Sequence, residues 1–377
     1  MGAATVKVVL ASTTLAPLVV PLVSPALQVI RNAFGITDAQ ASLLISVYFL
    51  TGIVLSPFIS ILADRLGRRY VLVPSLFVFS LCGGALALSP DYTTLLIIRL
   101  LQGTAAAGIF ITTVTLIGDA FDGVQRNAVL GVNTAVLSAG AALYPLVGGV
   151  LVGYAWNAPF LAYLAGLPVA AFALLTLDEP ISEREPRSLT YIRGALSALG
   201  GRRTITFYGT AFFTEVLLFG SVLTALPFLL AEQFSLSPVL IGLVVMVAEL
   251  ASVVALQNGL FARFLSNGTL GFVLYGVGLF GLWLAATPLL VGVSVVFIGA
   301  GLGLSMPSVD AAISGLVSPR FLAGALSIRN STTFLGRAVG PVLFAGLVVS
   351  TGYRPLLFGA GLVAVAWGGV VFVTTRP

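Results

Sequence analysis

The feature that most constrains this chain is a series of long apolar runs, separated by short segments that contain glycine, proline or charged residues. A membrane hydrocarbon core of about 30 Å needs about 20 apolar residues for each helical crossing. Lipid offers the backbone no hydrogen-bond partners, and the runs lack the alternation of barrel strands, so each run should be a helix. We expect these helices at 8–30, 40–63, 70–89, 93–118, 128–154, 158–177, 205–230, 238–262, 268–286, 289–313, 322–349 and 355–374.

Composition agrees with a lipid environment and excludes several classes of function. Hydrophobic residues make up 58% of the 377 residues and charged residues only 8%, whereas a soluble domain is about 25% charged. The chain has no histidine, which removes histidine-based acid–base catalysis and the commonest metal ligand. It also has no Gly-Lys-Ser/Thr phosphate loop and no basic run long enough to bind nucleic acid. We therefore expect no enzyme activity, no cofactor and no metal.

The placement of arginine and lysine predicts the orientation in the membrane, because these residues concentrate in cytoplasmic loops. With the N-terminus inside, only Arg31 and Arg354 fall in outer loops. The basic residues that would then be cytoplasmic are Lys7, Arg65, Arg68, Arg69, Arg126, Arg184, Arg187, Arg193, Arg202, Arg203, Arg263, Arg320 and Arg376. We expect an integral protein of the plasma (inner) membrane with both termini in the cytoplasm.

The longest polar stretch, residues 178–204, lies midway along the chain and separates two groups of six runs. We expect two six-helix bundles, 1–177 and 205–377, joined by this stretch as a cytoplasmic linker. Within it, apolar residues at helical spacing from Leu189 to Leu199 indicate a short helix on the inner membrane surface. A linker without regular structure is the alternative.

A charged motif, Leu62-Ala-Asp-Arg-Leu-Gly-Arg-Arg69, follows the second run. It resembles the major facilitator superfamily signature Gly-x-Leu-Ala-Asp-Arg-x-Gly-Arg-Arg, with Ser60 in place of the first glycine. The resemblance implies that Asp64 meets the cytoplasmic start of the eleventh helix and locks the two halves together in the outward-open state. An ordinary positively charged cytoplasmic loop is the alternative. The residues of this gating motif are Asp64, Arg65, Gly67, Arg68 and Arg69.

The fourth run contains Arg99-Leu-Leu-Gln102-Gly103, which is similar to the Arg-x-x-Gln-Gly motif of the same family. An arginine within a span costs about 2.5–3.5 kcal/mol, so its side chain should face a cavity or a partner. The resemblance implies that Arg99 assists proton transfer. The alternative is that its long side chain extends to the outer membrane interface.

The fifth run contains a Gly- and Pro-rich motif that resembles the antiporter signature Gly-x-x-x-Gly-Pro-x-x-Gly-Gly. Tyr144 stands where that signature has its second glycine. Small residues let helices approach closely and proline kinks them locally, so simple helix packing is the alternative explanation. The matching positions are Gly140, Pro145, Gly148 and Gly149.

Three ionisable residues, Glu215, Glu249 and Arg337, fall near the middle of runs in the second half. An ionisable residue inside the membrane is a functional hypothesis by default. We expect Glu215 to carry a coupling proton, because the first run has no acidic residue and the seventh helix of this family lines the central cavity. A fixed Glu249–Arg337 ion pair is the alternative, and we expect Asp310 to be structural, paired with Arg329.

These motifs together predict a twelve-helix, all-α transporter with the major facilitator fold, most similar to the drug/proton antiporter group. The preferred function is export of a small amphipathic or hydrophobic compound in exchange for protons, by a monomer in the lipid bilayer. A carrier of a sugar, an amino acid or another metabolite is the alternative, and a membrane enzyme or a non-transporting sensor is less favoured. The side chains expected to line the cavity are Phe110, Asn133, Tyr144, Phe212, Phe213 and Asn258.

Overall fold

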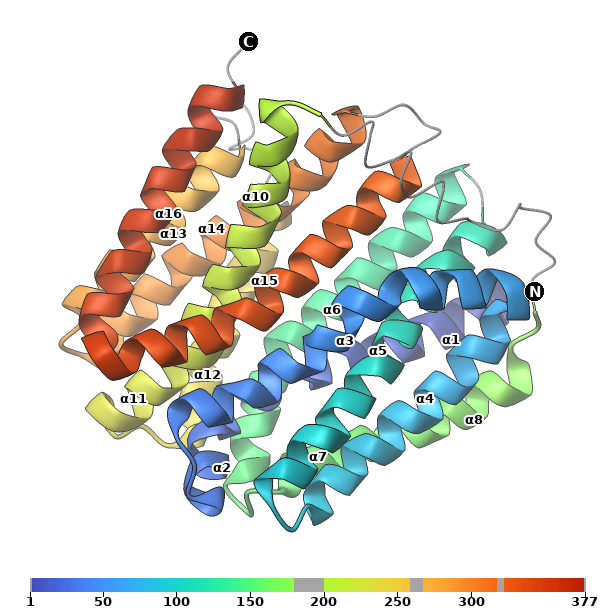
Figure 1. Ribbon diagram of the computed structural model, residues 1–377, viewed down its shortest axis with the longest axis horizontal. Coiled ribbons are helices and arrows are strands. Elements are labelled where there is room, and N and C mark those ends of the chain that lie inside the picture. The colour runs from blue at the N-terminus through green and yellow to red at the C-terminus, as the bar shows by residue number, and fades with distance from the viewer. Residues whose placement is uncertain (1, 122, 180–199, 258–266, 317–321, 376–377) are drawn as a thin grey trace.

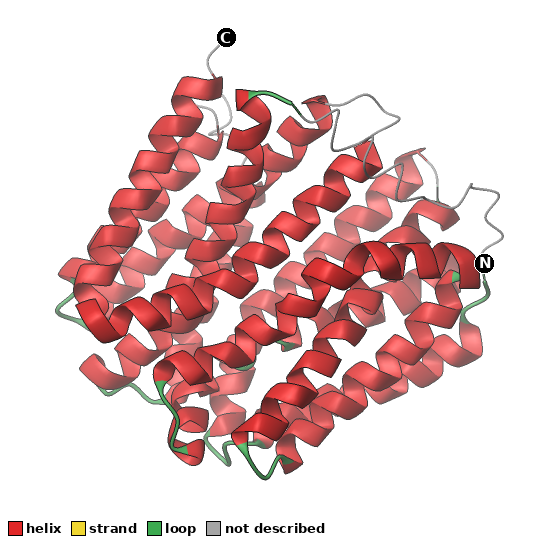
Figure 2. Ribbon diagram, in the orientation of Figure 1, coloured by secondary structure: helices red, strands yellow, loops and turns green. Residues whose placement is uncertain are grey.

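The structure is a computed structural model, which describes residues 2–121, 123–179, 200–257, 267–316 and 322–375. Every regular element that these residues form is helical (Figure 2). The long helices of the N-terminal half (residues 1–177) are α1 Gly2–Leu15, α3 Asp38–Leu66, α4 Arg68–Ala85, α5 Tyr92–Ala120 and α6 Gly123–Val152, with the shorter α2 Leu27–Phe34, α7 Ala158–Leu161 and α8 Gly166–Thr176. Those of the C-terminal half (residues 205–377) are α10 Arg202–Leu217, α11 Leu226–Phe234, α12 Pro238–Gln257, α13 Asn267–Leu284, α14 Pro288–Leu316, α15 Leu322–Thr351 and α16 Tyr353–Thr375.

The all-helical membrane class predicted from the apolar runs is confirmed. Ten helical segments of the described residues are long and apolar enough to cross a membrane. Shorter apolar helices at Ala4–Leu18 and Gly268–Leu284 occupy the two remaining runs. Each predicted run therefore coincides with a helical segment. The predicted helix within the linker falls outside the described residues.

The first run differs from a continuous helix. After α1 the chain forms a 3₁₀ turn at Ala16–Leu18, an irregular stretch, and a second 3₁₀ turn at Ser24–Ala26 before α2 begins. Pro17, Pro21 and Pro25 lie in this segment, and each lacks the backbone N–H that a continuing helix needs. The proline spacing therefore explains why this run is broken in its middle.

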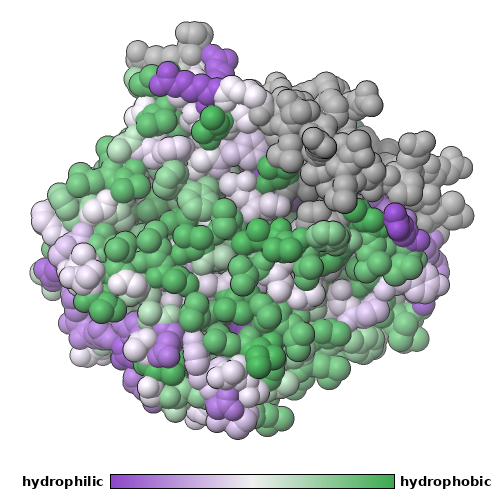
Figure 3. Space-filling view, viewed as in Figure 1, coloured by the Kyte–Doolittle hydropathy of each residue, from purple (hydrophilic) through white to green (hydrophobic). Residues whose placement is uncertain are grey.

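Apolar side chains cover the outside of the bundle. Figure 3 shows hydrophobic residues across the middle of one face, with hydrophilic residues gathered toward its edges. Exposed large apolar residues occur along most long helices, for example Val54 on α3, Leu175 on α8 and Val349 on α15. A soluble protein would not expose an apolar surface this extensive, whereas lipid would cover it.

The two halves contact each other mainly through α3 against α15 and α6 against α12. Figure 1 shows α3 and α15 running side by side through the centre of the molecule. The start of α1 and the end of α16 lie toward the upper and right-hand edge of that view, whereas α2 and α11 lie at the opposite edge. We call the edge with the chain termini the terminal face. The edge with α2, the start of α3, α11 and the start of α16 is the latch face.

Candidate functional site

A buried ion pair joins α10 to α15 in the middle of the C-terminal half. Arg337 Nη2 donates to Glu215 Oε1 at 2.8 Å. The Glu215 side chain is only 1% exposed, whereas that of Arg337 is 29% exposed. Glu215 therefore has a counter-ion on another helix, and the alternative prediction of a Glu249–Arg337 pair is wrong. The role of Glu215 as a proton carrier stays a prediction.

Two glycines bring α15 close enough to α10 for this pair to form. A Cβ at Gly336 would lie 2.7 Å from the Phe212 carbonyl oxygen and 2.8 Å from Glu215 Cβ. A Cβ at Gly340 would lie 2.6 Å from the Val216 carbonyl oxygen. Directly after α10, residues Leu218–Ala225 form a π-helical segment, a feature that is frequent at functional sites. Close packing thus fixes the backbone around Glu215 and Arg337.

Aromatic rings from both halves surround the Arg337 guanidinium. Its Cζ lies 5.4 Å from the ring centre of Phe219, 5.6 Å from that of Phe49 and 5.7 Å from that of Phe334. Phe49 belongs to α3 in the N-terminal half, whereas the other two rings belong to the C-terminal half. Phe110 on α5 meets Phe334 edge-on, with ring centres 5.8 Å apart. A single cation therefore lies at an aromatic junction between the halves.

Glu249 is a second carboxyl in the same region, on α12. It lies close enough to Glu215 and to Tyr275 on α13 for electrostatic interaction. Its side chain is partly exposed, and no ion pair joins it to any described residue. The Tyr275 hydroxyl lies 3.3 Å from Ser221 Oγ in the π-helical segment. The site thus combines two carboxyls with one guanidinium. The side chain of Asp310 is outside the described part of the chain, so its predicted pairing with Arg329 stays a prediction.

Arg99 is enclosed within the N-terminal half. Its side chain donates to Gln102 Oε1 at 2.6 Å, to the Tyr163 hydroxyl at 3.1 Å and to the Val19 carbonyl oxygen at 3.2 Å. Tyr163 in turn donates to the Leu18 carbonyl oxygen at 2.9 Å. The break in the first run frees these carbonyl groups, and the two side chains bond them again. Arg99 is 1% exposed, so the alternative that it extends to the membrane interface is wrong.

The gating motif lies on the terminal face and forms its contacts with the N-terminal half and with Glu179 at the start of the linker. Gly67 has φ +107°, which favours glycine at this turn. Arg68 forms ion pairs with Asp64 at 2.6 Å and with Asp119 at the end of α5 at 2.8 Å. Glu179 accepts the backbone N–H groups of Arg68 and Arg69 at 2.6 and 2.7 Å, and so caps the start of α4, where the helix dipole favours a negative charge.

This arrangement bears on the predicted role of Asp64. One of its oxygens binds Arg68, and the other, Oδ2, is buried without a hydrogen-bond partner among the described residues. The residues directly before α15 are outside the described part of the chain, so the predicted contact with the eleventh helix stays a prediction. Arg65 is exposed. Sequence reasoning did not identify Asp119 or Glu179, since neither belongs to a motif.

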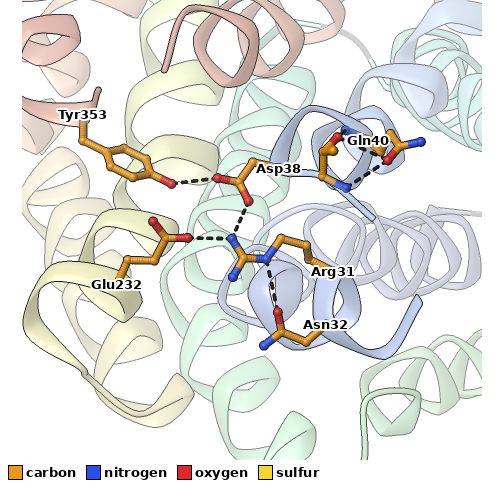
Figure 4. A network of polar contacts seen from close by, with 7 residues as sticks. Arg31, Asn32, Asp38, Gln40, Glu232 and Tyr353 are labelled. Atoms are coloured by element: carbon orange, nitrogen blue, oxygen red, sulfur yellow. Dashed lines mark hydrogen bonds and ion pairs between the residues drawn. The ribbon is translucent and has the colours of Figure 1, made fainter. Parts of the chain in front are cut away.

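A polar network joins the two halves on the latch face (Figure 4). Arg31 Nη1 lies 2.5 Å from Asp38 Oδ1 in its own half and 2.5 Å from Glu232 Oε1 in the other half. Tyr353 at the start of α16 donates to Asp38 Oδ2 at 2.9 Å. The Arg31 guanidinium also lies 5.5 Å from the ring centre of Phe228 on α11. We call Arg31, Asp38, Glu232 and Tyr353 the latch. Sequence reasoning missed it as a site, because its members lie in four separate segments.

The antiporter-like motif on α6 packs against the broken first run and against α12. A Cβ at Gly148 would lie 1.8 Å from the Leu22 carbonyl oxygen, and one at Gly149 would lie 2.3 Å from the Pro238 carbonyl oxygen of α12. Gly140 lies against Pro17. The motif therefore holds α6 against the broken first run and against the other half, which is a packing role, while a direct role in antiport stays a prediction.

The side chains predicted to line a cavity do not form one group. Phe110 lies at the aromatic junction. Asn133 accepts a hydrogen bond from Thr13 at 2.6 Å and Tyr144 donates to the Thr14 carbonyl oxygen at 3.0 Å, so both hold α6 against α1. The rings of Phe212 and Phe213 contact each other, and Phe213 also contacts Trp367 on α16. Asn258 is outside the described residues.

Comparison with known proteins gives four matches. A family model described as the Major Facilitator Superfamily matches residues 9–268. The chain is 27% identical over 357 residues to a bacillibactin exporter of Bacillus subtilis (strain 168), which covers 89% of this chain and 88% of that one. It is 28% identical over 209 residues to the quinolone resistance protein NorA of Staphylococcus aureus (strain MRSA252), covering 53% of this chain and 51% of NorA. Among solved structures, an inward-facing, unoccupied bacterial homologue of the human lysosomal transporter Spinster aligns with TM-score 0.79 and 17% identity, over 99% of this chain and 96% of that one.

Proposed function

This chain belongs to the major facilitator superfamily and is a membrane transporter, and from that premise we propose that it exports a small amphipathic or hydrophobic compound in exchange for protons. The observation that carries this proposal is the match to the bacillibactin exporter, which covers nearly the whole of both chains. The partial match to NorA points in the same direction. Export of a small molecule is thus favoured over carriage of a sugar, an amino acid or another nutrient.

The polar contacts between the two halves support transport by alternating access. The described polar bonds between the halves include Arg31 to Glu232, Tyr353 to Asp38 and Ser24 Oγ to the Leu223 carbonyl oxygen. The first two lie on the latch face. If the terminal face is cytoplasmic, as the basic residues predict, then the structure is closed toward the outside. Export then requires the latch to open and the terminal face to close, with Asp64 free to bind the start of α15.

We assign proton coupling to the carboxyl pair of Glu215 and Glu249, with Glu249 as the group that binds and releases the proton. Glu215 forms an ion pair with Arg337 at 2.8 Å. Glu249 has no ion-pair partner among the described residues and is partly exposed, so it is the carboxyl from which a proton can exchange with the transport path.

The test uses purified protein reconstituted into liposomes. Binding of bacillibactin and of a fluorescent quinolone is measured first, because the two relatives named for these compounds are exporters or confer resistance. Transport of any compound that binds is then followed with and without a pH gradient. A compound that shows no binding serves as the control. Uphill transport that needs the gradient supports the proposal. Binding without transport, or equal transport without a gradient, would contradict it.

A further inference from the structure

We propose that Arg337 is a positioning residue that transmits the charge state of Glu215 to the contact between the two halves, through the ring of Phe49. The inference rests on alternating access in the proposed function but not on the substrate or on proton coupling. The inference is based on the two partners of the Arg337 guanidinium, one in each half of the protein. Arg337 binds Glu215 in its own half and lies over Phe49 in the other half.

The two contacts differ in how far they can change. Gly336 and Gly340 clamp α15 onto α10 and the π-helical segment, where no larger residue would fit without displacing backbone. Glu215 and Arg337 therefore move together as one body. Phe49 lies on α3, which belongs to the half that must move relative to α15 when the transporter changes its open side. The contact between Arg337 and Phe49 is thus the one that alternating access makes and breaks.

The pair is also incompletely bonded. Glu215 Oε2 and Arg337 Nε are both buried without a hydrogen-bond partner among the described residues. A buried charged group that keeps unused bonding capacity is sensitive to any change in nearby charge. The charged and titratable groups around it are Glu215 on α10, Glu249 on α12, Tyr275 on α13 and Tyr48 on α3. Neutralising Glu215 would leave the guanidinium without its counter-ion.

The consequence follows from the partial exposure of Arg337. A guanidinium that loses its carboxylate partner is better solvated by water than by three phenyl rings. Because 29% of the Arg337 side chain is already exposed, we expect the guanidinium to turn toward solvent while the helix stays in place. It then leaves the ring of Phe49, and the halves lose a contact that favours the state with the latch face closed. Loss of charge at Glu215 therefore favours opening of the latch face.

The experiment measures conformation directly, so it remains informative even if no transported compound is found. Spin labels are placed at Ala33 and Ser237, two exposed residues of different halves near the latch face, in a Cys82→Ala background. Pulsed electron paramagnetic resonance gives the ratio of open to closed latch faces in purified, monodisperse protein. We expect Glu215→Gln to raise this ratio about three- to tenfold, the range of a partly desolvated cation–π contact.

A double-mutant cycle distinguishes transmission from local destabilisation. In a Phe49→Leu background, Glu215→Gln should change the ratio less than twofold, because the aromatic ring that Arg337 contacts in the other half has been removed. Phe110→Leu is the matched control, since Phe110 lies in the same aromatic junction but contacts Phe334. In that background the full effect of Glu215→Gln should remain.

Arg337→Lys provides a second route if Glu215→Gln proves unstable. Lysine keeps the charge that Glu215 needs but lacks the planar guanidinium that stacks on rings. We expect Arg337→Lys to raise the open-to-closed ratio as Phe49→Leu does, with no further increase when both are combined. Equal effects of Glu215→Gln with and without Phe49, or additive effects of Arg337→Lys and Phe49→Leu, would overturn the proposal.

Discussion

The latch offers the most direct test of what holds the latch face closed. Glu232→Gln removes the charge that Arg31 uses to reach across to the other half, while it keeps the shape of the side chain. Arg31 retains Asp38 in its own half at 2.5 Å, so neither half should lose its fold. We therefore expect the change to act on the equilibrium between closed and open latch faces and not on stability.

The expected size of the shift in the open-to-closed ratio follows from how exposed the two paired side chains are. The side chains of Arg31 and Glu232 are 20% and 36% exposed, so their ion pair is only partly shielded and should contribute about 0.5–1 kcal/mol. The open-to-closed ratio should rise about two- to fivefold in Glu232→Gln. Asp38 is less exposed, at 17%, and also accepts the Tyr353 hydroxyl. The combined change Asp38→Asn with Glu232→Gln should therefore shift the ratio by more than tenfold, since hydrogen bonds to charged groups contribute about 1.5–3 kcal/mol.

The assay is the inter-half distance between labels at Ala33 and Ser237, measured in low and in 1 M salt. Salt should move the unmodified protein toward the Glu232→Gln ratio, because the Debye length falls to about 3 Å at 1 M. Asp91→Asn is the matched control, since Asp91 is an exposed carboxylate that caps its own helix by accepting from Thr94. A Glu232→Gln ratio no different from that of Asp91→Asn would refute the assignment of this network as a latch.

Four further predictions concern transport, topology and packing. Glu249→Gln should abolish gradient-driven export yet preserve exchange of substrate between the two sides, and uphill export at the normal rate would move the coupling site elsewhere. The Asp64→Asn protein should insert and fold normally but transport more slowly. A normal transport rate would indicate that the loop only sets the orientation in the membrane. Labels at positions 1, 190 and 377 should be accessible from the cytoplasm and one at position 34 from outside; a cytoplasmic position 34 would overturn the assignment of the spans. Gly149→Ala places a Cβ 2.3 Å from the Pro238 carbonyl oxygen and should raise the open-latch ratio, whereas Gly131→Ala on the same helix meets nothing within 4 Å and should leave it unchanged.

The amino-acid sequence alone determined the helical membrane class, the approximate helix positions and the motifs. These properties are local, since each depends on the length of an apolar run or on a few neighbouring residues. The sequence also predicted that Glu215, Glu249 and Arg337 lie within membrane-spanning helices. It left their pairing open, because ion pairing depends on the rotation of each helix about its own axis and on how closely the helices approach.

The tertiary structure decided which charged groups meet. Gly336 and Gly340 bring α15 onto α10, so that Arg337 binds Glu215 and not Glu249. The latch joins Asp38 to Tyr353, which is 315 positions away in the chain. No periodicity or motif relates such residues, and only the packing of one half against the other brings them within hydrogen-bond distance. A lipid environment favours helix formation in each apolar segment independently. The contacts that open and close a transporter form only between segments, so they depend on the tertiary structure.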